Sequence, residues 1–400
     1  NFQKLPITNF KLIVNNSINV NPIENTIING RLKNELINQK LLEFLIPNQL
    51  DVSFDKKNIK LFINFNILGI DKTYKYKVNT IFEKLLPADS FTLKDLSTAH
   101  FLIVDNDTKT ITFKKEKITL KSDLGFPKNY RIIIRDSTMI DFLNSSRLYT
   151  QSPMICKGTE KNPITFTSSD SSSNGLLIYN TESESEFDYC SFSNFKSSKS
   201  SRKTGALTTY ESKIKIKNSR FYDNETEDAF NGIRSEVEFN NLVFVNCHSD
   251  AIDLDFCIGT IKKSEFLNVG NDAIDFSGCY FNIEDINILN VQDKAISIGE
   301  ESQIIGSNIT ISNSNIGIAA KDKSIAEFNL INLNNLKIGY SVYKKKPEFG
   351  PAFLVINNSN NVNLNKLFFL EKNSKLTINN EKINDYTDEV SLLLQNNFSN

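Results

Sequence analysis

The 400-residue sequence contains no tryptophan, two methionines and two histidines, and the scarcity of histidine limits its chemistry. A metal site built from several histidines is excluded, and a catalytic triad of serine, histidine and aspartate would have to use His100 or His248. His248 lies in an expected turn, two residues before Asp250, where a solvated histidine is the simpler interpretation.

Four other absences exclude whole classes of protein. The 46 lysines and arginines are balanced by 47 aspartates and glutamates, so the basic excess of a nucleic-acid-binding protein is missing. No stretch approaches the ~20 apolar residues of a membrane span, and no glycine-rich phosphate loop is present. The five cysteines form no CxxC pair, and their odd number argues against a disulfide framework.

What the sequence does contain is a repeat of 22 residues. The segments "HSDAIDLDFCIG" (248–259) and "GNDAIDFSGCYF" (270–281) begin 22 residues apart, as do Cys257 and Cys279, which we expect to stack as free thiols. Periods of this length are typical of solenoids. Three rows keep the step, the last with one step of 23: Ile252, Ile274, Ile296, Ile318 and Tyr340; Leu254, Phe276, Ile298, Ala320 and Val342; and Asn224, Asn246, Asn268, Asn290, Asn313 and Asn335.

Each repeat consists of short alternating segments such as "AIDLDF" and "NIEDINIL", which are typical of strands. A coil of about 22 residues with two or three such strands predicts an all-β fold, a right-handed parallel β-helix whose coils stack ~4.8 Å apart. The isoleucine row is then interior. The asparagines would lie at a turn in left-handed backbone, with amides bonded along the ladder.

The repeat does not extend over the whole chain. Residues 1–95 do not follow it and are predicted to form a small α+β module, residues 96–385 form the β-helix, and residues 386–400 form a C-terminal tail or cap over an open sheet edge. Within the first module, strand-like runs lie at 9–16, 49–54 and 58–67, and a helix-like run lies at 32–46.

Across roughly residues 100–380 the coil pattern resembles the pectate-lyase-like superfold of parallel β-helices. Several segments are more narrowly similar to β-helix modules of bacterial surface proteins with CotH-type kinase domains: "FLIVDNDTKTITF" with "YRIIIRDSTMIDFLNSS", "KGTEKNPITFTSSDSSSNGLLIYN", and "AISIGEESQ", "IGIAAKDKS" and "GYSVYKKKPEFGPA".

This resemblance implies an extracellular or cell-envelope protein. Its partner would be a polysaccharide or a surface or envelope protein, and the chain could be part of a larger assembly. Kinase activity is not implied, because residues 1–95 are too short for a kinase domain and carry no nucleotide motif.

An acidic row lies beside the interior isoleucines. Stacking places Asp253 and Asp275 ~5 Å apart, and Asp255 lies ~7 Å from Asp253 along one strand. Carboxylates this close raise one pKa or recruit a cation. They would suit Ca²⁺, the only cofactor indicated, or a retaining glycosidase, and Lys321 could add a base. Asp253, Asp255, Asp275 and Lys321 are therefore candidate catalytic residues, and the three aspartates are candidate metal ligands.

A structural interpretation competes with this one. Aspartate before a strand forms Asx-turns, and exposed polar ladders block unwanted strand pairing. Asp228, Asp250 and Asp272 fit that role, with Lys294 continuing the row as a charge partner. The same interpretation is the simpler one for Asp253 and its neighbours.

Ligand-binding candidates lie further along the outward rows. Ser297 and Tyr343 occupy them, and "YKKKPEFG" (343–350) adds Lys344, Lys345 and Lys346, a cluster that could meet an anionic glycan or simply be a solvated loop. The leading hypothesis is a non-catalytic extracellular or cell-surface scaffold or adhesion module that contacts glycan or a partner protein. The alternative is a polysaccharide lyase or glycoside hydrolase. A groove over the aspartates would favour the enzyme.

Overall fold

The computed structural model describes residues 7–14, 18–22, 61–67, 71–77, 96, 99–114, 117–173, 175–196, 205–346, 349–388 and 390. The chain divides into two compact units, Asn1–Leu85 and Leu86–Asn400. None of the helical segments in the described residues has the length and hydropathy needed to cross a membrane.

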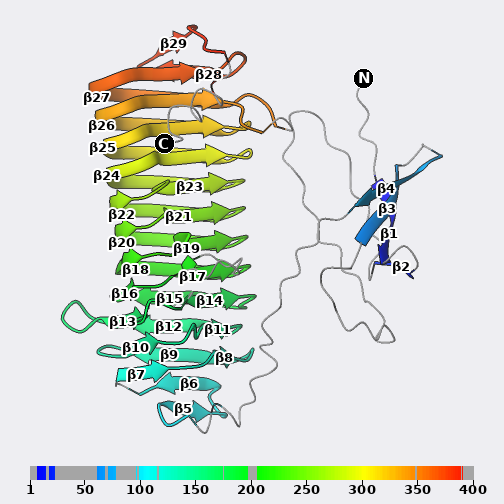
Figure 1. Ribbon diagram of the computed structural model, residues 1–400, viewed down its shortest axis with the longest axis vertical. Coiled ribbons are helices and arrows are strands. Elements are labelled where there is room, and N and C mark those ends of the chain that lie inside the picture. Colours follow the sequence, from blue (N-terminus) through cyan, green and yellow to red (C-terminus); the bar gives the residue numbers. More distant parts are fainter. Residues whose placement is uncertain are drawn as a thin grey trace. The chain divides into compact units, whose positions relative to one another are not determined.

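The first unit contains a small antiparallel sheet of four strands in the order β2-β1-β3-β4 (Figure 1). The strand-like runs at 9–16 and 58–67 coincide with β1 and β3, whereas the run at 49–54 and the helix-like run at 32–46 lie outside the described residues. Stacked rings of Phe65 and Tyr74, 5.6 Å apart, cover part of the sheet. The bounds are β1 Ile7–Val14, β2 Ile18–Val20, β3 Leu61–Ile67 and β4 Thr73–Lys77.

The second unit is an all-β solenoid, a parallel β-helix in which each strand pairs with its counterpart one coil away (Figure 1). The predicted fold class is confirmed. The early coils consist of short strands: β5 Leu102–Asp105, β6 Thr110–Phe113, β7 Lys117–Leu120, β8 Leu124–Phe126, β9 Arg131–Arg135, β10 Met139–Phe142, β11 Leu148–Thr150, β12 Met154–Lys157, β13 Ile164–Thr167, β14 Leu176–Tyr179, β15 Ser185–Asp188, β16 Cys190–Ser193 and β17 Gly205–Tyr210.

The strands of the later coils are β18 Lys213–Asn224, β19 Asp228–Ile233, β20 Glu236–Cys247, β21 Asp250–Asp255, β22 Ile258–Val269, β23 Ile274–Ser277, β24 Tyr280–Gly299, β25 Gln303–Lys321, β26 Ile325–Tyr343, β27 Phe353–Leu370, β28 Lys375–Ile378 and β29 Glu381–Ile383. Strands β18, β20, β22, β24, β25, β26 and β27 have 12 to 20 residues, because each continues around a corner of the solenoid.

The interior consists of columns of like side chains. Ile252 pairs in register with Ile274, and the column continues through Ile296, Ile318 and Tyr340, all fully buried. The second predicted row, from Leu254 to Val342, is also buried. A further column holds parallel phenylalanine rings 4.5–5.0 Å apart, at positions 192, 221, 244 and 266. Such columns follow from stacking, because a residue that fills the space in one coil fits the next.

The asparagine ladder is present, with one correction. Asn268 donates from Nδ2 to Oδ1 of Asn246, and Asn290 donates in the same way to Asn268, at 2.9 Å in both cases. These residues have φ of 54–60°, the left-handed backbone expected at the turn. The ladder begins at Asp223 rather than Asn224, because the coil step here is 23 residues, and Asn224 bonds instead to the backbone of buried Phe195.

Both ends of the parallel stack finish in antiparallel pairs, β5 with β6 and β28 with β29. Reversing the chain there shortens the open edge that a parallel stack would otherwise present. Within the predicted C-terminal tail, the structure describes residues 386–388 and 390. Val390 is fully buried beside Ile316 and Tyr343, on the outer side of the solenoid.

Candidate functional site

The acidic residues gather on the outward face of strands β19, β21 and β23. Asp253 and Asp275 are direct register partners in adjacent coils, and Asp255 pairs with Ser277 in the next column. The three carboxylates are neither buried nor fully exposed, and the side chain of Asp275 is 22% exposed. The structure therefore brings together the three aspartates that the repeat predicted to be neighbours.

This crowding changes their protonation. Burial, followed by the negative charge of Asp275, raises the pKa of Asp255 to about 6. Burial and the carboxylates of Asp228 and Asp255 also raise the pKa of Asp253, whose Oδ2 accepts a hydrogen bond of 3.1 Å from Asn231. The site thus holds proton-carrying carboxyl groups next to Asp275 at mildly acidic pH.

Lys321 reaches this cluster from two coils away. Its Nζ lies 3.7 Å from Oδ1 of Asp275, and its side chain is 6% exposed. Burial lowers the pKa of Lys321, but the negative groups around it, Asp275 foremost among them, together outweigh burial, and the pKa is raised. The lysine therefore stays cationic beside the carboxylate of Asp275.

Gly299 makes this reach possible, a role that sequence reasoning missed. It lies between Lys321 and Ser277 in the outward column, and a Cβ there would come within 3.0 Å of the Cε of Lys321. The missing side chain leaves a channel for the lysine stem. The glycine that follows "AISI" in the sequence was the available signal. It indicates space for a side chain only when the residue one coil further, here Lys321, is known.

Ser297 occupies the rung beyond Asp275 and is fully buried. Its Oγ has no hydrogen-bond partner in the described part of the chain, and Oδ1 of Asp275 likewise accepts no hydrogen bond there. Buried polar atoms normally have hydrogen-bond partners, so the Oγ of Ser297, next to a carboxylate oxygen whose contact is the ion pair with Lys321, is consistent with a site that receives a polar group.

The row of Asp228, Asp250 and Asp272 differs from the predicted Asx-turns. Asp250 Oδ1 accepts a hydrogen bond of 2.8 Å from the backbone N–H of Asp272, and Asp272 Oδ1 accepts one of 2.9 Å from the N–H of Lys294. Asp250 and Asp272 therefore bond to the coil beyond rather than to their own turns. Lys294 is the expected charge partner, with Nζ 3.3 Å from Asp272 Oδ1.

The basic segment after β26 is held by carboxylates. The backbone N–H groups of Lys345 and Lys346 donate to Asp322 Oδ1 at 2.7 and 2.6 Å, and the Lys346 ammonium pairs with Glu300. The charge of Lys321 and burial lower the pKa of Lys345. Lys344 lines a hollow of about 450 Å³ at the far end of the solenoid. Tyr343 is buried beside Lys321 in the column.

No group of three or more histidine, cysteine, aspartate or glutamate side chains in the described residues is arranged to hold a metal ion. A calcium site at Asp253, Asp255 and Asp275 stays a prediction of the sequence. The five cysteines are free and buried, and Cys257 donates its backbone N–H to the sulfur of Cys279, as stacked thiols would allow.

Two apolar patches flank the acidic residues along the same outward face. Towards the N-terminal coils, Tyr149, Leu177 and Tyr179 are buried with Tyr210 against them. Towards the C-terminal coils, Ile316, Ala319, Ile338, Tyr343 and Val390 form the second patch. The aspartates thus form a partly exposed interval between two buried apolar patches.

The sequence matches no protein-family model and no curated protein. Among solved structures, the chain is similar to the catalytic unit of a GH87 α-1,3-glucanase from Streptomyces thermodiastaticus, with 9% identity over 90% of this chain and 86% of that one, and a TM-score of 0.38. It is also similar to an alginate lyase from Paenibacillus, with 11% identity over 62% of this chain and 97% of that one, and a TM-score of 0.30.

A third similar structure is the enzymatically active domain of tailspike protein 2 of bacteriophage CBA120, with 11% identity, 66% of this chain covered and a TM-score of 0.36. The chain spans about half the length of that domain, 48%. Likenesses of this size concern the coiled backbone and assign neither substrate nor activity to this chain.

Proposed function

We propose that the solenoid hydrolyses a polysaccharide, with Asp255 as the general acid and Asp275 as the general base. The proposal includes an extracellular or cell-envelope location, in keeping with the resemblance of the coil segments to modules of surface proteins. The observation that carries it is the unlike surroundings of two carboxyl groups on one outward face. Asp255 has a pKa of about 6, whereas Asp275 faces the ammonium of Lys321.

The spacing of the pair fits hydrolysis. Asp255 and Asp275 are one coil apart and offset by two residues along the strand, which separates their backbone positions by roughly 8 Å. Inverting glycosidases hold their two carboxyl groups roughly 6.5–9.5 Å apart, leaving room for a water molecule between base and sugar. Because the two side chains project from the same face, we expect their carboxyl groups to keep about this separation, and the proposal predicts an inverted anomeric configuration in the product.

Each carboxyl group then has a distinct task. The proton of Asp255 is transferred to the glycosidic oxygen as the bond to the leaving sugar breaks. Asp275 takes a proton from the water that attacks the anomeric carbon from the other side. Lys321, whose stem passes Gly299, forms an ion pair with Asp275 and would hold its carboxylate in place between turnovers. A general acid works best when its pKa is near the operating pH, which places the optimum in mildly acidic solution.

A lyase is less well supported. Elimination needs a neutral base to remove a carbon-bound proton, and Lys321 was the sequence-based candidate. Its raised pKa and its ion pair with Asp275 keep it protonated, so its lone pair is not available. Lys321 is better suited to act as the ion-pair partner of Asp275.

A non-catalytic glycan- or protein-binding module is the second candidate. The two covered apolar patches beside the aspartates support it, because they narrow the exposed interval in which a polymer chain could bind. The two functions share the aspartates but differ in whether a bond is broken.

The test is release of sugar ends from a panel of neutral and acidic polysaccharides at pH 5, compared with Asp255→Asn and Asp275→Asn. We expect reducing ends without unsaturated ends, and a loss of rate of about 10²–10⁴-fold in each variant. Asp223→Asn, a carboxylate in the turn ladder, is the matched control and should keep full activity.

Unsaturated ends would instead indicate a lyase. Binding without release of ends would identify the non-catalytic module. Equal loss of activity in Asp223→Asn would show that any change to the stacked acids damages the fold.

A further inference from the structure

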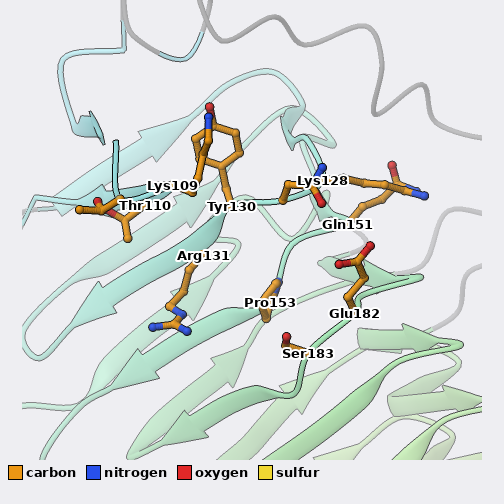
Figure 2. A pocket seen from close by; sticks show the side chains of 11 residues that line it. Lys109, Thr110, Lys128, Tyr130, Arg131, Gln151, Pro153, Glu182 and Ser183 are labelled. Carbon is orange, nitrogen blue, oxygen red and sulfur yellow. The ribbon is translucent and has the colours of Figure 1, made fainter. Parts of the chain in front are cut away.

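A second feature lies on the turns near the N-terminal end of the solenoid. It is a groove of about 290 Å³ formed by the same turn of four successive coils, and its lining includes Lys109, Tyr130, Gln151 and Glu182 (Figure 2). Figure 2 shows Lys109 and Tyr130 on one side and Glu182 and Ser183 on the other. Its volume is near the lower end of the ~300–1,000 Å³ typical of ligand pockets, so it suits a ligand of about one sugar residue.

The charge around this groove is unbalanced. Lys109, Lys128 and Arg131 line it against a single carboxylate, Glu182. Across the described residues, none of these four side chains takes part in an ion pair of 4.0 Å or less. Three cationic residues therefore line this groove, in a chain whose net charge is −1.

Several lysines elsewhere on the coils are paired. Lys157, Lys213 and Lys262 each pair with a glutamate one coil further, at 3.1, 2.6 and 3.0 Å. Stacking offers such partners readily, because side chains in register lie ~4.8 Å apart. Their absence around the groove leaves its cations available to a ligand.

The walls of the groove are fixed by hydrogen bonds. The Tyr130 hydroxyl donates to Asn106 Oδ1 at 2.9 Å, and the Tyr130 N–H donates to Ser152 Oγ at 2.9 Å. The Lys109 ammonium lies 5.4 Å from the centre of the Tyr130 ring, and the N–H of Arg131 donates to the carbonyl of Lys109. A ligand would meet groups that are already in position, which lowers the entropy lost on binding.

We infer that this groove binds an anionic sugar residue, with its carboxylate against Arg131 and with Lys109 and Lys128 adding positive charge to the lining. A guanidinium presents paired donors that match a carboxylate. The remaining lining suits sugar hydroxyls, since Gln151 can donate and accept and Glu182 can accept. A bare anion would use the cations but not these groups.

The groove is distinct from the acidic site. Asp255 lies three coil steps beyond Tyr179, the residue that precedes the Glu182 turn, which is roughly 14 Å along the axis. Binding in the groove therefore stands independently of the proposed hydrolysis, although a polymer lying along the solenoid would extend from one to the other.

The experiment is calorimetric titration of the full chain with trigalacturonic acid, its methyl ester and inorganic phosphate. We expect the acid to bind, with an affinity that falls as salt rises, and the neutral ester to bind about tenfold or more weakly, because a charge-assisted contact is lost. Arg131→Gln and Lys128→Gln should each weaken the acid by about tenfold, whereas Lys161→Gln, an exposed lysine outside the groove, should not.

Three results would overturn the inference: no binding of the acid, equal binding of acid and ester, or phosphate binding as tightly as the trisaccharide. Asp255→Asn should bind the acid as the unchanged chain does, so failure of hydrolysis and failure of this site can be told apart.

Discussion

Two faces of the same solenoid differ in which charges are stacked from coil to coil. On strands β19, β21 and β23, stacking places like charges together, with Asp253 directly over Asp275. On strands β18, β20, β22 and β24 it places opposite charges together, as in Lys213 over Glu236 and Lys262 over Glu284. The spacing between coils is the same, so the difference lies wholly in which residues occupy the register.

The two arrangements have different consequences for proton binding. Hydrogen bonding to Glu236 raises the pKa of Lys213, which stays charged and solvated at any ordinary pH. Burial and neighbouring carboxylates raise the pKa of Asp255 into the working range. Carboxyl groups with a perturbed pKa cluster at functional sites. The lysine–glutamate pairs on the other face are structural ion pairs. On the acidic face, by contrast, Asp253 has a carboxylate as its register partner, and the cations Lys294 and Lys321 come from coils further along.

The largest loss of stability is expected where the acidic row of Asp228, Asp250 and Asp272 is followed by Lys294. Lys294→Met leaves the buried carboxylate of Asp272 without its cation, and removing one partner of a buried pair costs about 3–5 kcal/mol of unfolding free energy. The measurement is urea unfolding followed by circular dichroism. The double variant Asp272→Asn with Lys294→Met should recover most of the loss, and a single variant as stable as the unchanged protein would mean that the pair is solvated.

A smaller effect should separate the two faces by pH. The pKa of Asp255 is about 6 in the folded chain and near 3.8 when unfolded, so its protonated form stabilises the fold fully below pH 4, and this contribution is lost as pH rises through 6. Allowing for partial exposure, the loss is about 1–2 kcal/mol between pH 4 and pH 7.

Asp255→Asn should flatten that part of the pH profile of the melting temperature, whereas Glu236→Gln on the paired face should leave it unchanged. A profile of the same slope in Asp255→Asn would show that the carboxyl group titrates at its ordinary pKa.

The smallest effect belongs to the paired face itself. Lys213→Gln breaks an ion pair whose two side chains are 59% and 49% exposed, and such pairs contribute about 0.2–1 kcal/mol. The difference in melting temperature from the unchanged protein should disappear in 1 M salt. A larger, salt-resistant loss would indicate that Lys213 stabilises the coils by packing rather than by charge.

The sequence predicted the interior well, since each coil must repeat the shape of the one below. Ile252, Ile274 and Ile296 therefore recur at a constant step, and their column could be read directly. Where the coil length changes, counting failed: Asn224 lies one position from the ladder that it was expected to begin, because the register there advances by 23. The expected helix at 32–46 lies outside the described residues and stays a prediction.

The site shows the same division. That Asp253 and Asp275 are neighbours followed from the period alone. That Lys321 crosses Gly299 to reach Asp275 did not, because a side chain spanning two coils depends on what the intervening coil leaves empty.

The period of 22 residues by itself determined the stacked coils, their apolar interior and the identity of the outward acidic column, because stacking at a fixed spacing converts sequence distance into contact. Only the tertiary structure decided which of those acids carry protons and where a groove lies. Protonation depends on burial and on charges from several coils at once, as for Asp255. The groove at Lys109, Arg131 and Glu182 is lined by turns of coils whose lengths differ, so no single period brings those residues together.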